Sequence, residues 1–164
     1  MRSVFLVLAL LGPSIVLAQS ASSPPQTGGA VDQKGARFDG KWLTKLTCPP
    51  KGNTEGYTWQ FASVIENSNF RGERGTAGDP GYLLIEGKIA TDGSAKLSAT
   101  GLVASRKYAR GVFTHKGEDY SYNIKANFQE TEGTGTRDTG LGIVGRPCTF
   151  DFVKQEATNQ TGER

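Results

Sequence analysis

The sequence predicts an all-β protein, an up-and-down antiparallel β-barrel of about eight strands, on three observations. Apolar and polar residues alternate with a period of two through most of the central part of the chain, as they do in half-buried strands. Glycine, asparagine and aspartate separate the alternating stretches and mark tight turns. The only two cysteines, Cys48 and Cys148, lie in the first and the last of these stretches.

The first element is a leader. The chain begins with MRSVFLVLALLGPSIVLA, which combines one arginine, an apolar run and small residues at its end. This pattern predicts a secretory signal peptide over residues 1–18, cleaved after Ala18. A membrane anchor is the alternative, but the run is short for a bilayer span and Gly12-Pro13 interrupts it. We therefore expect export, to the periplasm or out of the cell, and no membrane span after cleavage.

Two polar segments flank the expected barrel. Residues 19–36 are rich in Ser, Pro, Gly, Gln and Ala and lack aromatic residues, so they predict a disordered linker. Residues 156–164 are equally polar and predict a disordered tail. The barrel domain then covers residues 37–155, an ordinary length for one domain.

Eight alternating stretches define the expected strands, and every second residue in them is expected to face the interior. The stretches cover residues 41–48, 56–66, 69–75, 81–90, 94–101, 118–129, 132–138 and 147–154. Residues 102–117 add a short strand or a helical turn. The inward residues are Trp42, Leu46 and Cys48, then Tyr57, Trp59, Phe61 and Ile65, then Leu83, Ile85 and Ile89, then Ala95, Leu97 and Ala99, then Tyr120, Tyr122, Ile124, Ala126 and Phe128, and last Cys148, Phe150 and Phe152.

The two cysteines mark the place where the barrel closes. In an even-numbered meander that closes on itself, the last strand runs antiparallel to the first. Cys48 ends the first stretch and Cys148 begins the last, and both fall on the apolar face. Export supplies an oxidising compartment. The pattern predicts a Cys48–Cys148 disulfide at the seam, and the alternative is two unpaired buried thiols.

The net charge limits the classes of partner. The whole chain has 19 Lys and Arg against 16 Asp and Glu, and removal of the signal peptide takes away one of the arginines. A nearly neutral balance without a basic run gives no case for a nucleic acid or an anionic membrane surface. A small molecule or another protein remains as the expected partner.

Six short segments resemble a group of small exported bacterial proteins and modules of uncharacterised function. They are FDGKW, KLTCPP, GYTWQF, GERGTAGDPGYL, DGSAKLSATG and RPCTFDFVKQ, and the resemblance extends over most of residues 37–155. The resemblance is most specific at the two cysteine motifs and at Gly72-Glu73-Arg74-Gly75. It implies export but no activity.

A more distant resemblance concerns the first strand. Its opening, Gly40-Lys41-Trp42, is similar to that of lipocalin, avidin and bacterial protease-inhibitor barrels. This likeness implies a lipocalin- or avidin-like barrel. Avidins hold biotin with tryptophans on later strands, and this chain has none after Trp59, so biotin binding is not implied.

The residue types needed for catalysis or metal binding are scarce. His115 is the only histidine, so a histidine-based metal site lacks a second ligand, and the two cysteines lack zinc spacing. No nucleophile-elbow motif accompanies His115. Asp119 and Asp151 fall on the polar faces of their strands. We expect neither an enzyme nor a bound metal or cofactor.

The cysteine end of the barrel is the candidate site for a small ligand. Its inward positions are Tyr57, Trp59, Tyr120 and Tyr122, with Arg74 on the same parity as Phe70. Tyrosine and tryptophan combine a large apolar ring with a hydrogen-bonding group, and an inward arginine needs an acidic partner or an anionic ligand. Long connections surround this end, namely residues 49–55, 76–80, 102–117 and 139–146.

Two alternatives stay open. In the first, the tyrosines cap a filled core and Arg74 pairs with a loop carboxylate such as Asp79. In the second, the protein is a protein-binding module, a protease inhibitor or a binder of an envelope partner. The second would use an apolar loop, and residues 102–117 carry Leu102, Val103, Tyr108, Val112 and Phe113. The opposite end of the barrel is expected to be plugged by Ile65, Ile89, Phe128 and Phe152.

Overall fold

The computed structural model describes residues 37–109, 115–139 and 146–156. The predicted signal peptide and linker, and the predicted tail after Glu156, lie outside the described residues. The described residues belong to the predicted barrel domain.

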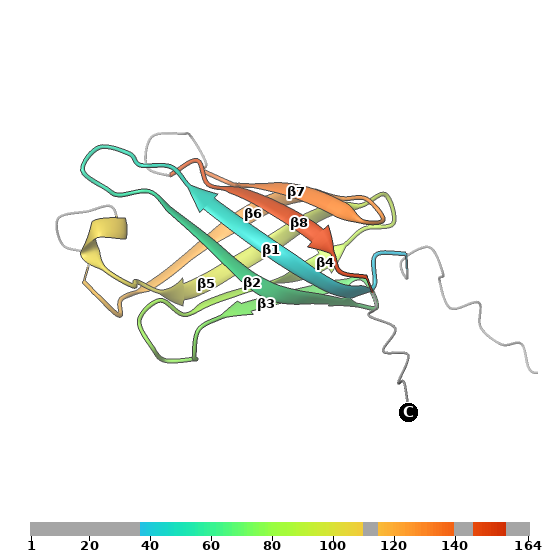
Figure 1. The fold of residues 1–164 in the computed structure, drawn as a ribbon, viewed down its shortest axis with the longest axis horizontal. Coiled ribbons are helices and arrows are strands. Elements are labelled where there is room, and N and C mark those ends of the chain that lie inside the picture. Colours follow the sequence, from blue (N-terminus) through green and yellow to red (C-terminus); the bar gives the residue numbers. More distant parts are fainter. Residues whose placement is uncertain (1–36, 110–114, 140–145, 157–164) are drawn as a thin grey trace, which may run out of the picture. The chain divides into compact units, whose positions relative to one another are not determined.

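Eight antiparallel strands close into a barrel in the order β1-β2-β3-β4-β5-β6-β7-β8, which confirms the predicted fold class (Figure 1). Every predicted strand end lies within two residues of the observed one. A 3-10 helix, η1 (Arg106–Tyr108), is the helical turn expected after the fifth strand. The strands are β1 (Gly40–Cys48), β2 (Tyr57–Glu66), β3 (Asn69–Arg74), β4 (Leu83–Ile89), β5 (Ser94–Leu102), β6 (Asp119–Phe128), β7 (Glu132–Arg137) and β8 (Thr149–Lys154).

The two ends of the barrel differ in their connections. Short turns join β2 to β3, β4 to β5 and β6 to β7 at the end drawn on the right of Figure 1, which we call the closed end. The longer connections after β1, β3, β5 and β7 lie at the other end, which we call the mouth. The strand order therefore places every long connection around one opening, as the sequence predicts.

Aromatic rings fill the closed end. Phe128 lies at the centre, with its ring centroid 4.7 Å from Phe152, 5.6 Å from Trp42 and 5.8 Å from Phe70. Phe38, just before β1, is fully buried against it, and its carbonyl accepts a hydrogen bond from Trp42 Nε1 at 2.9 Å. The predicted plug of Ile65, Ile89, Phe128 and Phe152 is confirmed, because all four side chains are buried.

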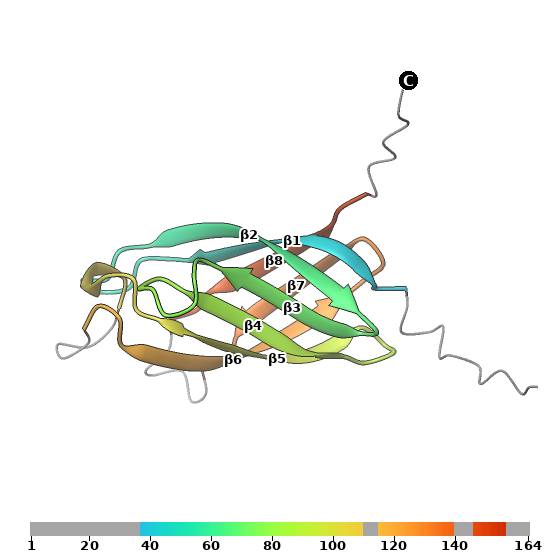
Figure 2. The same cartoon turned by 90° about the horizontal axis from the view of Figure 1, so that it is seen from below.

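Two β-ladders are short, and this widens the barrel toward the mouth. Only Ser63–Glu66 of β2 pair with β3, where their partners are Asn69–Gly72. In the described chain, no strand pairs with residues 57–62 on the edge of β2 that faces β3. Figure 2 shows β2 and β3 separating in this direction. The ladder of β6 and β7 likewise starts only at Ile124. Strands that separate leave interior space that side chains have to fill or a ligand can occupy.

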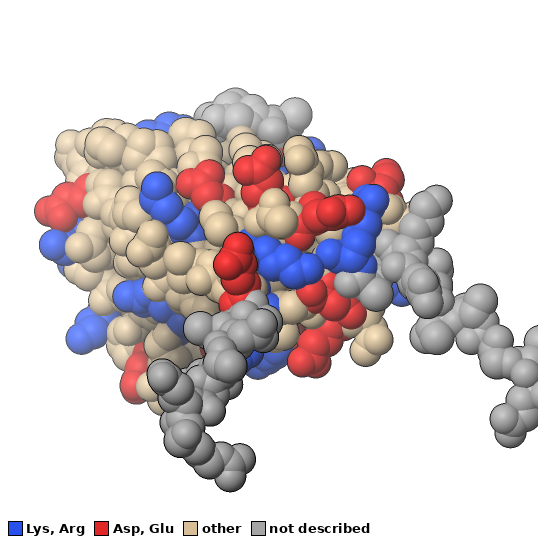
Figure 3. All heavy atoms as spheres, turned by 45° about the vertical axis from the view of Figure 1, so that its right-hand side comes forward, with Lys and Arg blue, Asp and Glu red and all other residues tan. Residues whose placement is uncertain are grey.

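Charges of both signs are mixed on the outer surface. On the face drawn in Figure 3, acidic and basic side chains lie among one another. On the strands, Arg71 pairs with Glu73 and Glu86, and Lys45 lies 3.8 Å from Asp151. Within the described residues, no helix has the length and apolar character that a membrane crossing requires.

Candidate ligand-binding site

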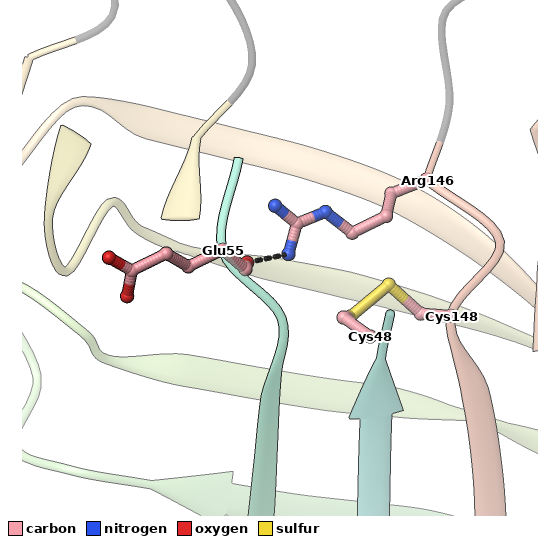
Figure 4. Close-up of a disulfide and its surroundings, with 4 residues drawn as sticks. All are labelled: Cys48, Glu55, Arg146 and Cys148. Atoms are coloured by element: carbon pink, nitrogen blue, oxygen red, sulfur yellow. Dashed lines mark hydrogen bonds between the residues drawn. A yellow bond between two sulfur atoms is a disulfide. The ribbon is translucent and has the colours of Figure 1, made fainter. Parts of the chain in front are cut away.

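A disulfide joins the first and last strands at the mouth. Cys48 is the last residue of β1 and Cys148 directly precedes β8, and their sulfur atoms are bonded (Figure 4). Both cysteines are buried. The predicted pairing is confirmed, and the alternative of two unpaired thiols is wrong.

A cavity of about 270 Å³ opens beside this seam. Strands β2, β6 and β7, the connection between β5 and β6 and the segment just before β8 form its wall. The lining residues are Tyr57, Trp59, Val103, Ala104, Tyr108, Ala109, Glu118, Asp119, Tyr120, Tyr122, Arg137 and Arg146.

The structure brings four of the five predicted site residues together in the wall of this cavity. Tyr57 and Trp59 follow each other on the inner face of β2, with ring centroids 4.4 Å apart. Tyr120 and Tyr122 do the same on β6, with their rings stacked at 6.0 Å. All four pack against the buried core without being fully buried themselves. They therefore offer aromatic surface to anything that enters the mouth.

Arg74, the fifth predicted residue, has a different place. Its guanidinium lies 3.9 Å from the centre of the Trp59 ring and donates a hydrogen bond to the Gly81 carbonyl at 2.6 Å. Arg74 is not in the cavity wall, and among the described residues it makes no ion pair with Asp79. Arg74 therefore links the Trp59 ring to the connection between β3 and β4, which carries Gly81.

Two arginines of the cavity wall were missed by the sequence prediction. Arg137 ends β7, and Arg146 lies two residues before Cys148. A signal for each was present. Arg146 shares its parity with Cys148, and Arg137 shares its parity with Gly133 and Gly135 on the inner face of β7. Glycine has no side chain, so the inward positions of β7 show no apolar alternation in the sequence, and Arg137 was not predicted to face inward.

Each arginine of the wall lies over a tyrosine. The Arg137 guanidinium is 4.1 Å from the centre of the Tyr122 ring, and that of Arg146 is 5.4 Å from Tyr57. Arg146 is 3% exposed, and its Nη1 donates to the Glu55 carbonyl at 2.9 Å (Figure 4). Such contacts hold a guanidinium on an aromatic face and fix its direction.

The pKa of the Tyr57 phenol is affected by the positive charges around the cavity. Burial raises the pKa of Tyr57, and the charges of Arg146, Arg137 and Arg74 oppose this rise. Three guanidinium groups therefore act on one hydroxyl. The mouth combines aromatic walls with a cationic interior.

The connection between β5 and β6 contributes to the cavity. Val103 is 8% exposed and lines the cavity together with Tyr108, whose ring meets Tyr57 edge-on at 5.4 Å. These residues turn inward and do not form the projecting apolar loop of the protein-binding hypothesis. Leu102, also named in that hypothesis, is the half-buried last residue of β5, and Val112 and Phe113 lie outside the described residues.

The described residues offer no cluster for metal chemistry. Across residues 37–109, 115–139 and 146–156, no group of three His, Cys, Asp or Glu side chains could hold a metal ion. His115 lies exposed in the connection before β6, where its backbone N–H donates to the Glu118 carboxylate at 2.8 Å.

The two tyrosines of β6 lead to a prediction about alkaline pH. Burial is the main cause that raises the pKa of Tyr120 and Tyr122 well above the usual tyrosine value, and neighbouring phenols add to it. Below pH 10 both the folded and the unfolded chain keep these protons. Above about pH 10 the unfolded chain loses protons that the folded chain retains, so the free energy of unfolding falls as pH rises.

We expect the Tyr120→Phe/Tyr122→Phe variant to lose less stability than the parent between about pH 9 and pH 11. Urea unfolding at a series of pH values measures this difference. Equal losses in the two proteins would show that the β6 phenols are not protected by burial.

No protein-family model matches the chain, and comparison with curated proteins and with solved structures finds no significant match.

Proposed function

We propose that this protein is exported and binds a small ligand in the cavity at the barrel mouth, without catalysing a reaction. The observation that carries the proposal is the cavity of about 270 Å³ whose wall includes Tyr57, Trp59, Tyr120 and Tyr122. Ligand sites are typically concave and lined by aromatic side chains with a few polar groups. Small barrels hold ligands in this kind of opening. The disulfide supports export, because such bonds persist in oxidising compartments.

The size of the cavity limits the ligand. Sites for drug-sized molecules measure about 300–1,000 Å³. A cavity of about 270 Å³ therefore suits a smaller compound, such as one ring with one or two substituents. The flat phenol and indole surfaces favour a planar ring, which stacks on them with offset or edge-on geometry.

Two tryptophans at opposite ends of the barrel provide the test. Trp59 lies in the cavity wall, whereas Trp42 is 1% exposed in the closed end. We expect the Trp59 indole N–H resonance to shift when the protein is titrated with benzoate, benzamide or benzamidine, and the Trp42 resonance to stay in place. The expected dissociation constant for such a small probe is on the order of 1 mM.

A matched pair of variants locates the binding. Ala104 lines the cavity, so Ala104→Phe fills it, whereas Ala62 is exposed on the outer face of β2. We expect Ala104→Phe to abolish the Trp59 shift and Ala62→Phe to leave it unchanged. If no probe of any charge moves Trp59, or if Ala104→Phe binds as the parent does, the proposed site is wrong.

A further inference from the structure

Arg137 lies in the cavity wall, and its guanidinium has a donor that makes no hydrogen bond within the described chain. Its backbone N–H donates to the Cys148 carbonyl at 2.9 Å, which fixes the residue beside the disulfide. Its guanidinium lies over Tyr122. Its Nε is buried and has no hydrogen-bond partner within the described chain. An arginine carries five N–H donors in a planar fork, and a buried donor without a partner costs free energy.

The carboxylates around the mouth do not neutralise this guanidinium. Glu55 pairs with Lys107 at 3.1 Å. Asp138, the neighbour of Arg137 in sequence, pairs with Lys125 at 3.1 Å on the outer surface.

Two further carboxylates, those of Glu118 and Asp119, belong to residues that line the cavity. The Glu118 carboxylate accepts the backbone N–H of His115, and Asp119 begins β6 on its exposed face. Among the described residues, Arg137 therefore has no ion-pair partner, although it faces a cavity wall of aromatic rings.

The second arginine strengthens the positive field at the same place. Arg146 lies over Tyr57 and is nearly inaccessible to water, so its charge is poorly screened inside the cavity. A guanidinium fork matches the geometry of a carboxylate, which accepts two parallel N–H bonds. Aromatic walls beside two arginine charges fit a planar ring that bears one negative group.

We infer that the ligand is a small aromatic carboxylate, whose ring stacks on Tyr57, Tyr120 and Tyr122 and whose carboxylate accepts hydrogen bonds from Arg137. Arg146 contributes a second positive charge to the carboxylate end. The inference rests on the proposed function, because it assigns the chemistry of the ligand to the same cavity.

Three probes of one shape and different charge test the assignment. Benzoate is an anion, benzamide is its neutral counterpart and benzamidine is a cation. We expect the purified, disulfide-bonded protein to bind benzoate at least tenfold more tightly than the other two, as followed by the Trp59 indole resonance. This preference should weaken in high salt because the binding depends on charge.

Variants of Arg137 assign the effect to one residue. Arg137→Gln keeps part of the hydrogen-bonding capacity but removes the charge. We expect it to weaken benzoate binding about tenfold or more and to change the affinity for benzamide little. Arg137→Lys should restore part of the benzoate affinity. Arg71→Gln is the control, because Arg71 pairs with Glu73 and Glu86 on the outer surface. We expect this variant to leave the affinities for all three probes unchanged.

The outcomes separate the two proposals. Equal binding of benzoate and benzamide would overturn the carboxylate assignment while the cavity remained a binding site. Tighter binding of benzamidine would overturn it too, and would assign the charge preference to Glu118 and Asp119. Absence of any Trp59 shift with all three probes would overturn the proposed function itself.

Discussion

Removal of the disulfide should cause a large loss of stability in this protein. The bond closes a loop with a sequence separation of 100 between Cys48 and Cys148. Such a cross-link restricts the unfolded chain, and the chain-entropy model gives up to about 4.7 kcal/mol for a loop of this length. We expect the Cys48→Ala/Cys148→Ala variant to lose about 4 kcal/mol in the free energy of unfolding, measured by urea denaturation.

Reduction provides the control for this prediction. A reducing agent should lower the stability of the parent protein by a similar amount and leave the double variant unchanged. A variant that unfolds at the urea concentration of the oxidised parent would show that the seam is held by the β1–β8 ladder alone.

Phe128→Ala should cause the second large loss. The Phe128 ring lies at the centre of the closed end and contacts Trp42, Phe70 and Phe152. Its removal leaves a cavity in a closely packed aromatic cluster, and buried Phe→Ala changes cost about 3–5 kcal/mol. Urea unfolding of the variant measures this change.

An exposed residue of the same sheet provides the comparison. Val153 on β8 is 49% exposed, so Val153→Ala should change the free energy of unfolding by less than about 0.5 kcal/mol. A loss below about 1 kcal/mol for Phe128→Ala would mean that the closed end does not depend on this ring for its packing.

The fold could be predicted because period-two alternation determines which face of each strand is buried. The alternation of Tyr120, Tyr122 and Phe128 with polar neighbours is enough to place β6, and its register in the barrel follows from the order of the turns. The disulfide was predictable for the same reason, since its two cysteines share the inward parity in the first and last alternating stretches.

The site could be predicted only in part. The aromatic residues of β2 and β6 were found because their rings stand out in an alternating pattern. Arg137 was missed because the inward residues before it on β7 are glycines. Arg74 was placed in the cavity because its parity is inward, but the β2–β3 ladder ends at Gly72, and no local sequence pattern reports the length of a ladder.

The barrel therefore has two ends with different roles. Phenylalanine rings and the Trp42 indole, whose N–H donates to the Phe38 carbonyl, fill the closed end. At the mouth the strands separate, and the cavity between them is lined by tyrosines, Trp59 and two arginines together with Glu118, Asp119 and small apolar residues. We expect most of the stability to come from the closed end and the disulfide, and we propose that the mouth binds a ligand.

A crystal structure of the protein with 4-bromobenzoate tests this account most directly, because the anomalous signal of bromine locates the probe independently of the protein chain. We expect one strong bromine peak in the cavity bounded by Tyr57, Tyr122 and Arg137, with the carboxylate directed to the Arg137 guanidinium. A mouth filled to the rim by side chains, with no bromine peak inside it, would contradict the account.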